Sequence, residues 1–197
     1  MIVVPWSIDP RLSGAVAEEL RRRVVGTHVR RVYYEIQRDA DWWGDDYARG
    51  SAAHEAGSGI VLSLDSGTQL IFSWQMEGLN EGLRIEVQAG AGHAYRDIFH
   101  RRVATGSVPP WPNVVASEIQ SLALSFHAPC DGCPRTLWAA RLQFASGASA
   151  VVTLGEVDSF GKPQYFPQQL VVIFDECMAR EYGGEGSAES SWGTVIE

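Results

Sequence analysis

The sequence is short of the features that mark secreted and membrane-spanning proteins. Its 197 residues include only three cysteines, an odd number that fits a reducing compartment better than a disulfide framework. No apolar run approaches the roughly 20 residues of a membrane helix. The apolar start Met1–Trp6 lacks the basic leader of a signal peptide. We therefore expect a cytoplasmic protein that does not enter a membrane.

Basic side chains are also few, and lysine is almost missing. The chain has 24 acidic and 16 basic residues, a net charge of -8, and Lys162 is its one lysine. We interpret the preference for arginine as the coding bias of a GC-rich bacterial genome. An acidic surface repels phosphate backbones, which disfavours nucleic-acid binding, and it attracts a basic protein partner. Hydrophobic residues make up 45% of the chain, enough for a folded core.

Motifs for catalysis and for cofactors are missing as well. The sequence contains no GxSxG elbow, no HExxH pair and no glycine-rich phosphate loop. Carboxylate pairs such as Asp45 and Asp46 are adjacent, whereas acid–base chemistry requires them on two sides of a cleft. We therefore predict a protein that is not an enzyme and that carries no cofactor. An enzyme of another type, using His93 or His100, is a third alternative.

What the sequence does contain is an internal repeat. Apolar positions near residues 26–36 recur 90 residues later, where Val29, Val32, Tyr34 and Ile36 match Ile119, Leu122, Leu124 and Phe126. The segment 59–74 recurs as 139–154 at an offset of 80, and in both copies alternating apolar residues flank a short turn that contains Gly67 or Gly147. Such alternation around a glycine turn is typical of a β-hairpin.

The repeat predicts a β-rich α+β fold. Two related antiparallel strand and hairpin units would form one sheet or a pseudo-symmetric sandwich, with two to three short helices. We expect the first unit and an N-terminal helix in residues 1–105, the second unit and a closing helix in 106–182, and a mobile tail in 183–197, all in one compact domain. The expected helices cover Ser13–Val25, capped by Ser13, then Tyr95–Val103 and Asp175–Tyr182, and Leu170–Phe174 is a buried strand.

One loop of the first unit has an unusual composition. Between residues 39 and 47 it packs four aspartates and three aromatic residues into nine positions. Aromatic side chains are favoured binding anchors, and flanking carboxylates pair with arginine or lysine on a partner. The alternative is that the tryptophans cover the edge of the core. The predicted partner-binding residues are Asp39, Asp41, Trp42, Trp43, Asp45, Asp46 and Tyr47.

Two segments of the sequence contain groups that can bind metal ions. The loop at residues 39–50 resembles a calcium loop at four positions, but Trp43 and Gly50 replace two essential ligands. Cys130 and Cys133 form a CxxC pair, which we interpret as a tight turn between strands. A zinc set would need two further ligands. The conceivable set is His127, Cys130, Cys133 and Cys177, and no metal is predicted.

Three segments resemble small bacterial proteins of unknown function, whose families include immunity proteins encoded beside interbacterial toxins. These segments are Gly59–Gly67, Phe72–Trp74 and Leu170–Glu176. The resemblance implies an inhibitor that blocks the active site of one toxin. We therefore expect an immunity or antitoxin-like protein that neutralises a basic partner by occlusion. The alternative is a small-molecule- or metal-binding protein with its pocket between the two units.

Overall fold

The computed structural model describes residues 2–4, 10–38, 52–77, 80–89, 100–127, 135–166, 168–183 and 189–196. Most of these residues lie in strands, which confirms the β-rich prediction. The described helices are α1 (Pro10–Val24), α2 (Glu176–Glu181) and the short 3-10 helix η1 (Trp111–Asn113). Within the described ranges, no helix is long and apolar enough to cross a bilayer.

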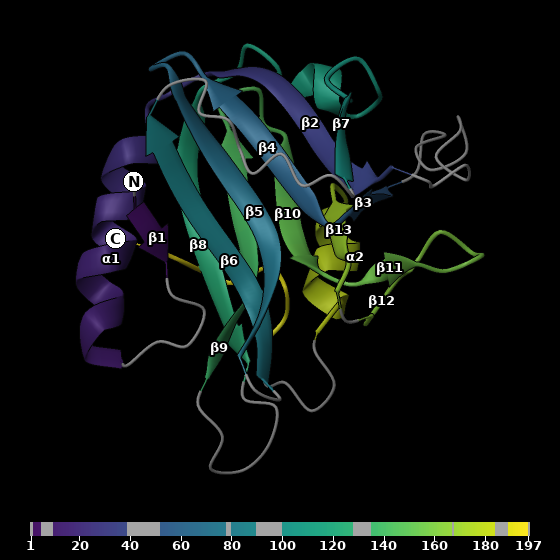
Figure 1. Ribbon diagram of the computed structural model, residues 1–197. Coiled ribbons are helices and arrows are strands. Elements are labelled where there is room, and N and C mark those ends of the chain that lie inside the picture. The colour runs from purple at the N-terminus through teal and green to yellow at the C-terminus, as the bar shows by residue number, and fades with distance from the viewer. Residues whose placement is uncertain are drawn as a thin grey trace.

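A single 12-stranded sheet forms the body of the molecule (Figure 1). Its strands lie side by side in the order β1 (Ile2–Val4), β6 (Asn80–Ala89), β5 (Thr68–Glu77), β4 (Gly59–Leu64), β2 (Val29–Gln37), β3 (Ala53–Gly57), β13 (Leu170–Ile173), β10 (Ser149–Leu154), β9 (Thr136–Phe144), β8 (Ile119–His127) and β14 (Thr194–Val195). A further strand, β7 (His100–Ala104), pairs with β2. The pairing of β2 with β3 is parallel, which makes the sheet mixed.

The sheet curls so that its two halves face each other. Strand β6 lies across from β9 and β10, and the inner faces enclose one continuous apolar core (Figure 1). Alternation along the strands produces this core, because every second side chain of a strand points to the same face. In β2, Val32, Tyr34 and Ile36 are buried while Arg30 and Gln37 are exposed.

Two runs of four antiparallel strands follow each other along the chain. The first is β2–β4–β5–β6 and the second is β8–β9–β10–β13. Corresponding pairs have corresponding registers, since Val32 pairs with Leu62 in the first run and Leu122 pairs with Leu142 in the second. Each run also has a register shift near its start, after Val29 and after Ile119.

The two predicted hairpins are present. Strands β4 and β5 turn at Gly67 and strands β9 and β10 turn at Gly147, with φ angles of 76° and 84°. The amide N–H of each glycine donates to the carbonyl three residues earlier, at Leu64 and at Phe144. A positive φ is strained for residues with a Cβ atom, which explains why glycine ends both turns.

The predicted helices are confirmed at two of three places. Helix α1 covers most of the range expected for the first helix, but it starts at Pro10, so Ser13 lies within the helix and does not cap it. Helix α2 is preceded by Asp175, whose side chain accepts a hydrogen bond from the N–H of Met178. The buried strand expected at Leu170–Phe174 is β13.

The prediction of a helix at Tyr95–Val103 is wrong for its described part, since His100–Ala104 forms β7. The edge of β2 offers hydrogen-bond partners there, and this pairing overrides local helix propensity. Arg30 and Arg31 are both exposed although they are neighbours on one strand, because a register shift lies between Val29 and Arg31. Of the tail that we expected to be mobile, residues 194–195 form β14, which pairs with β8.

Candidate functional site

The β11–β12 ribbon is a two-stranded sheet of its own, formed by β11 (Glu156–Val157) and β12 (Pro163–Gln164). It projects from the large sheet near β3 and β13 (Figure 1). The chain enters it at Gly155, where φ is +147° and a Cβ atom would lie 2.5 Å from the Tyr182 hydroxyl and 2.6 Å from the Gln164 carbonyl oxygen. Only glycine avoids these short contacts, so Gly155 sets the point at which the ribbon leaves the sheet.

The tip of the ribbon is an ordered turn that carries an exposed aromatic ring. The Asp158 carboxylate accepts hydrogen bonds from the N–H groups of Phe160 and Lys162, each at 2.8 Å, and the Asp158 N–H donates to the Lys162 carbonyl. Phe160 itself is 87% exposed, and Tyr165 and Phe166 beyond β12 are about half as exposed. Three exposed aromatic side chains on one projecting element are typical of an interaction surface.

Two carboxylates lie at the base of the ribbon. Burial raises the pKa of the Glu55 carboxyl on β3, and the nearby charge of Glu156 on β11 raises it further. Glu156 accepts a hydrogen bond from the Gln164 side chain at 2.6 Å. A nearby cation would relieve the repulsion between these two carboxylates, because an opposite charge favours the ionised form of each.

A recess of about 280 Å³ lies next to these carboxylates, at the ends of β2 and β3. Its lining combines carboxamide, carboxylate and backbone groups of Ile36, Gln37, Glu55, Gly57, Ser58, Gln168 and Gln169. Gly57 is required there, because φ is +69° and a Cβ atom would lie 2.8 Å from the Glu35 carbonyl oxygen. We call the recess, Glu55, Glu156 and the three exposed aromatics the acidic–aromatic face.

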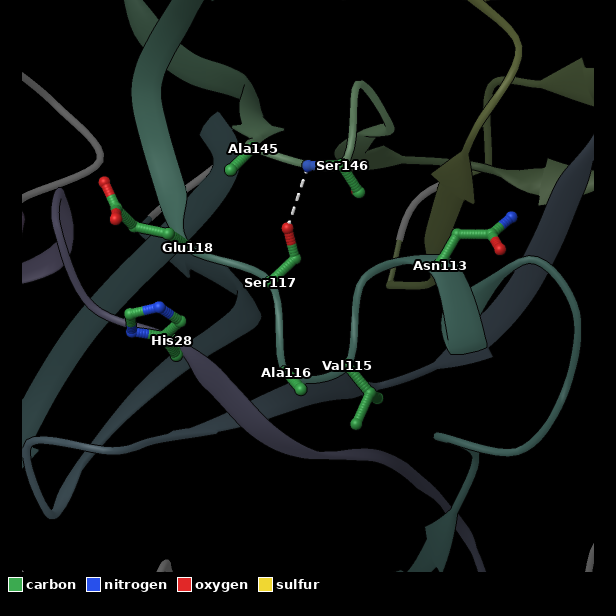
Figure 2. Close-up of a pocket in the computed structure, with 8 residues that line it drawn as sticks. All are labelled: His28, Asn113, Val115, Ala116, Ser117, Glu118, Ala145 and Ser146. Atoms are coloured by element: carbon green, nitrogen blue, oxygen red, sulfur yellow. Dashed lines mark hydrogen bonds between the residues drawn. The ribbon is translucent and has the colours of Figure 1, made fainter.

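A second, larger pocket of about 470 Å³ lies where the two strand runs meet (Figure 2). It adjoins an isolated antiparallel bridge, which pairs His28 with Glu118. The His28 ring lies 3.0 Å from an Asp65 carboxylate oxygen, and the pKa of Asp65 is lowered by hydrogen bonds from the His28 backbone and then from its side chain. Figure 2 shows His28 and Glu118 on one side of the pocket and Asn113 on the other.

The wall of this pocket combines polar and apolar groups, and among the residues that line it none is a nucleophile hydrogen-bonded to the histidine. The Ser117 hydroxyl accepts a hydrogen bond from the Ser146 N–H at 3.0 Å (Figure 2), and His28 pairs with Asp65. A nucleophile and its base need to be within hydrogen-bond reach of each other. The Ser117 hydroxyl and the His28 ring are hydrogen-bonding groups of these pairs that line the pocket.

The predicted partner-binding residues, Asp39, Asp41, Trp42, Trp43, Asp45, Asp46 and Tyr47, lie outside the described residues. The structure does describe the residues that precede this segment, and Gln37, two residues before Asp39, lines the recess. Strand β3, which carries Glu55, begins at Ala53. The predicted segment therefore joins the acidic–aromatic face along the chain.

The conceivable zinc set is only half described. Cys130 and Cys133 lie outside the described residues, Cys177 is a free, exposed cysteine on α2, and burial lowers the pKa of His127. Among the described residues, no group of three or more histidine, cysteine or carboxylate side chains is arranged to hold a metal ion. Of the two alternative catalytic histidines, His93 lies outside the described residues and His100 begins β7.

Sequence reasoning missed the aromatic and acidic residues of the ribbon. The signal that could have found them is the segment Asp158–Lys162, which places Phe160 inside a turn sequence of aspartate, serine and glycine. Glu55 carried no signal, because its proximity to Glu156 arises only when β11 packs near β3. No protein-family model, curated protein or solved structure matches the chain, so the geometry of these two sites is the basis for assigning a function.

Proposed function

We propose that this chain is a binding protein of the immunity or antitoxin type, which acts in the cytoplasm and occludes a basic partner protein without catalysis. The observation that supports this most is the ordered turn that exposes Phe160, at the tip of a ribbon whose base carries Glu156 close to Glu55. An exposed aromatic ring that inserts into a partner supplies affinity, and adjacent carboxylates select an arginine or lysine.

The net charge supports a basic partner. At -8, the chain attracts a positively charged protein over several ångströms, which raises the association rate more than the final affinity. The predicted segment Asp39–Tyr47 adds four carboxylates and three aromatic side chains to the same region of the chain. In this proposal it extends the acidic–aromatic face from the Gln37 side of the recess.

The proposal is tested by affinity capture with matched variants. The tagged wild-type protein, Phe160→Ser and a control, Met76→Ser, are incubated with lysate of the source cells and with the co-expressed product of the adjacent gene. Met76 is 45% exposed on β5, so it controls for loss of an exposed apolar side chain elsewhere. We expect one stoichiometric basic protein on the wild type and on Met76→Ser, and little of it on Phe160→Ser.

The proposal fails if no basic protein is captured in either format, or if Phe160→Ser retains it as well as the control does. Glu55→Gln is a further informative variant because it removes a charge that is unfavourable for folding. We expect Glu55→Gln to be at least as stable as the wild type and to bind the partner more weakly. This combination separates a binding role of Glu55 from a structural one.

We also propose that the two strand runs are copies of one unit related by approximate twofold symmetry. The contacts between them support this, since the Gly26 N–H donates to the Ile119 carbonyl and the Ala116 N–H donates to the Val29 carbonyl, at 2.8 and 2.7 Å. Residues 26 and 116, like 29 and 119, are 90 positions apart. Both Gly26 and Ala116 have positive φ angles, 83° and 66°.

A second candidate function uses the pocket between these units. A small polar ligand would bind beside the His28–Glu118 bridge, where side chains of both runs line the wall. A thermal-shift screen with metabolites and metal ions in the absence of any protein tests this candidate, because a ligand that binds only the folded state raises its melting temperature. If His28→Ala binds the hit as well as the wild type does, the pocket is not its site.

A further inference from the structure

Arg141 occupies an unusual position on β9. It is 6% exposed, between Ala139 and Leu142, which are fully buried. Its Nε has no hydrogen-bond partner among the described residues. It also takes part in none of the ion pairs formed within the described part of the chain. Leaving a buried N–H donor such as this Nε–H without an acceptor is unfavourable.

The contact that Arg141 does make is with an aromatic ring. Its guanidinium carbon lies 4.0 Å from the centroid of Trp192, and that of Arg180 on α2 lies 4.5 Å from the same centroid. Trp192 is held in place by its neighbour Ser191, whose N–H donates to the Tyr182 carbonyl and whose hydroxyl donates to the Ala179 carbonyl, both at 2.7 Å. Both guanidinium groups therefore contact the same ring, and they are near enough for the charge of Arg180 to lower the pKa of Arg141.

Charge around this pair is not balanced. The carboxylate of Glu176 acts on this pair, but it already pairs with Arg180 at 2.7 and 2.8 Å. Burial lowers the pKa of Arg141, and the charge of Arg180 lowers it further, while Glu176 opposes both. Attraction to the Trp192 ring offsets part of this cost and supplies no hydrogen-bond acceptor. The Arg180 side chain is 54% exposed, so the cluster opens to solvent on that side.

We propose that Arg141, Arg180 and Trp192 form a binding site for an oxyanion, the carboxylate or phosphate group of a small ligand. Planar guanidinium groups suit both anions because each presents parallel N–H donors to two oxygen atoms. The anion approaches past Arg180 and supplies the acceptor that the Nε–H of Arg141 lacks. The site uses side chains of β9, α2 and the C-terminal segment, so it is independent of the acidic–aromatic face.

The test is a titration of the full chain with inorganic phosphate and, separately, with acetate, at constant ionic strength set by sodium chloride. Tryptophan fluorescence reports on Trp192, and Trp192→Phe identifies which part of the signal belongs to it. We expect a saturable change with phosphate, with acetate or with both, together with a rise in melting temperature. A response to one anion alone identifies which group the site prefers.

Arg180→Gln is the principal variant, because its side chain is 54% exposed, and Arg22→Gln on α1 is the matched control, with a side chain 71% exposed. We expect at least a tenfold weaker apparent affinity in Arg180→Gln, no change in Arg22→Gln, and no binding in Arg141→Met if it folds. The proposal is overturned if neither anion gives a saturable response beyond that of chloride. It is equally overturned if Arg180→Gln binds as tightly as Arg22→Gln.

Discussion

A buried histidine makes the stability of this protein depend on pH in a predictable way. His54 on β3 is fully buried, its ring lies edge-on to Phe174, and its Nδ1 lies 3.0 Å from the Tyr34 hydroxyl. The Trp111 indole N–H donates to that hydroxyl oxygen at 2.7 Å. An indole can only donate, so the hydroxyl hydrogen is available for Nδ1, which accepts it in the neutral ring.

Burial lowers the pKa of His54 from 6.5 to about 4, and a hydrogen bond to the Pro109 carbonyl opposes only part of this shift. As pH falls through 6.5, the unfolded chain takes up a proton at this residue and the folded protein does not. The contribution of neutral His54 to folding stability is therefore fully present above pH 6.5 and is lost as the pH falls toward 4. Between pH 7.5 and pH 4.5 the loss is about 2.5 kcal/mol from this one group.

The assay compares urea unfolding of the wild type and of His54→Asn at pH 7.5, 6.5, 5.5 and 4.5. Asparagine places an acceptor near the position of Nδ1 and does not titrate. Glu55 and Asp65, whose pKa values are raised and lowered in the folded state, titrate in both proteins and cancel in the difference. We expect the wild type to lose about 2.5 kcal/mol more than His54→Asn over this range. Equal losses in the two proteins would refute the reasoning.

Three further predictions concern single contacts. Tyr34→Phe removes the hydroxyl that the Trp111 N–H and His54 share, and it should lower the free energy of unfolding by about 2–3 kcal/mol. A loss below about 0.5 kcal/mol, measured by urea unfolding, would contradict this. Gly193→Ala should destabilise the protein more than Gly147→Ala, although both residues have a positive φ. The Cβ atom at residue 193 would lie 2.7 Å from the Leu124 carbonyl group, whereas Gly147 faces open space. Equal melting temperatures for the two variants would be evidence against the packing of β14 on β8. Ala116→Gly should stabilise the protein by roughly 1 kcal/mol, since it removes the cost of a positive φ, and a lower melting temperature would argue against the equivalence of Ala116 and Gly26.

Local patterns predicted the parts of the fold that depend on local physics. Alternating apolar residues around Gly67 and Gly147 predicted both hairpins, and the helix expected at Asp175–Tyr182 is α2. Long-range pairing was not predictable in the same way. His100–Ala104 became a strand because β2 offered it a partner, and β3 joined the two runs through a parallel pairing with β2 that no local pattern marks.

The candidate site likewise combines residues that the sequence indicates with residues that only the fold brings together. Composition alone singled out Asp39–Tyr47, and a binding role for it stays a prediction. The exposed position of Phe160 depends on a turn that is held by hydrogen bonds to Asp158, and these bonds form only in the folded chain. The proximity of Glu55 to Glu156 and the stacking of Arg141 on Trp192 join residues far apart in sequence, and only the arrangement of strands brings them together.

The measurement that tests the central claim most directly is neutralisation in living cells. The captured basic partner is expressed from an inducible promoter together with the wild type, with Phe160→Ser carrying Glu55→Gln, or with the control Met76→Ser. We predict that the wild type and the control abolish the growth defect caused by the partner, while the double variant does not, although it accumulates to the same level. Equal protection by the double variant, or a partner that causes no growth defect, would contradict the proposal that this chain neutralises a toxic protein through its acidic–aromatic face.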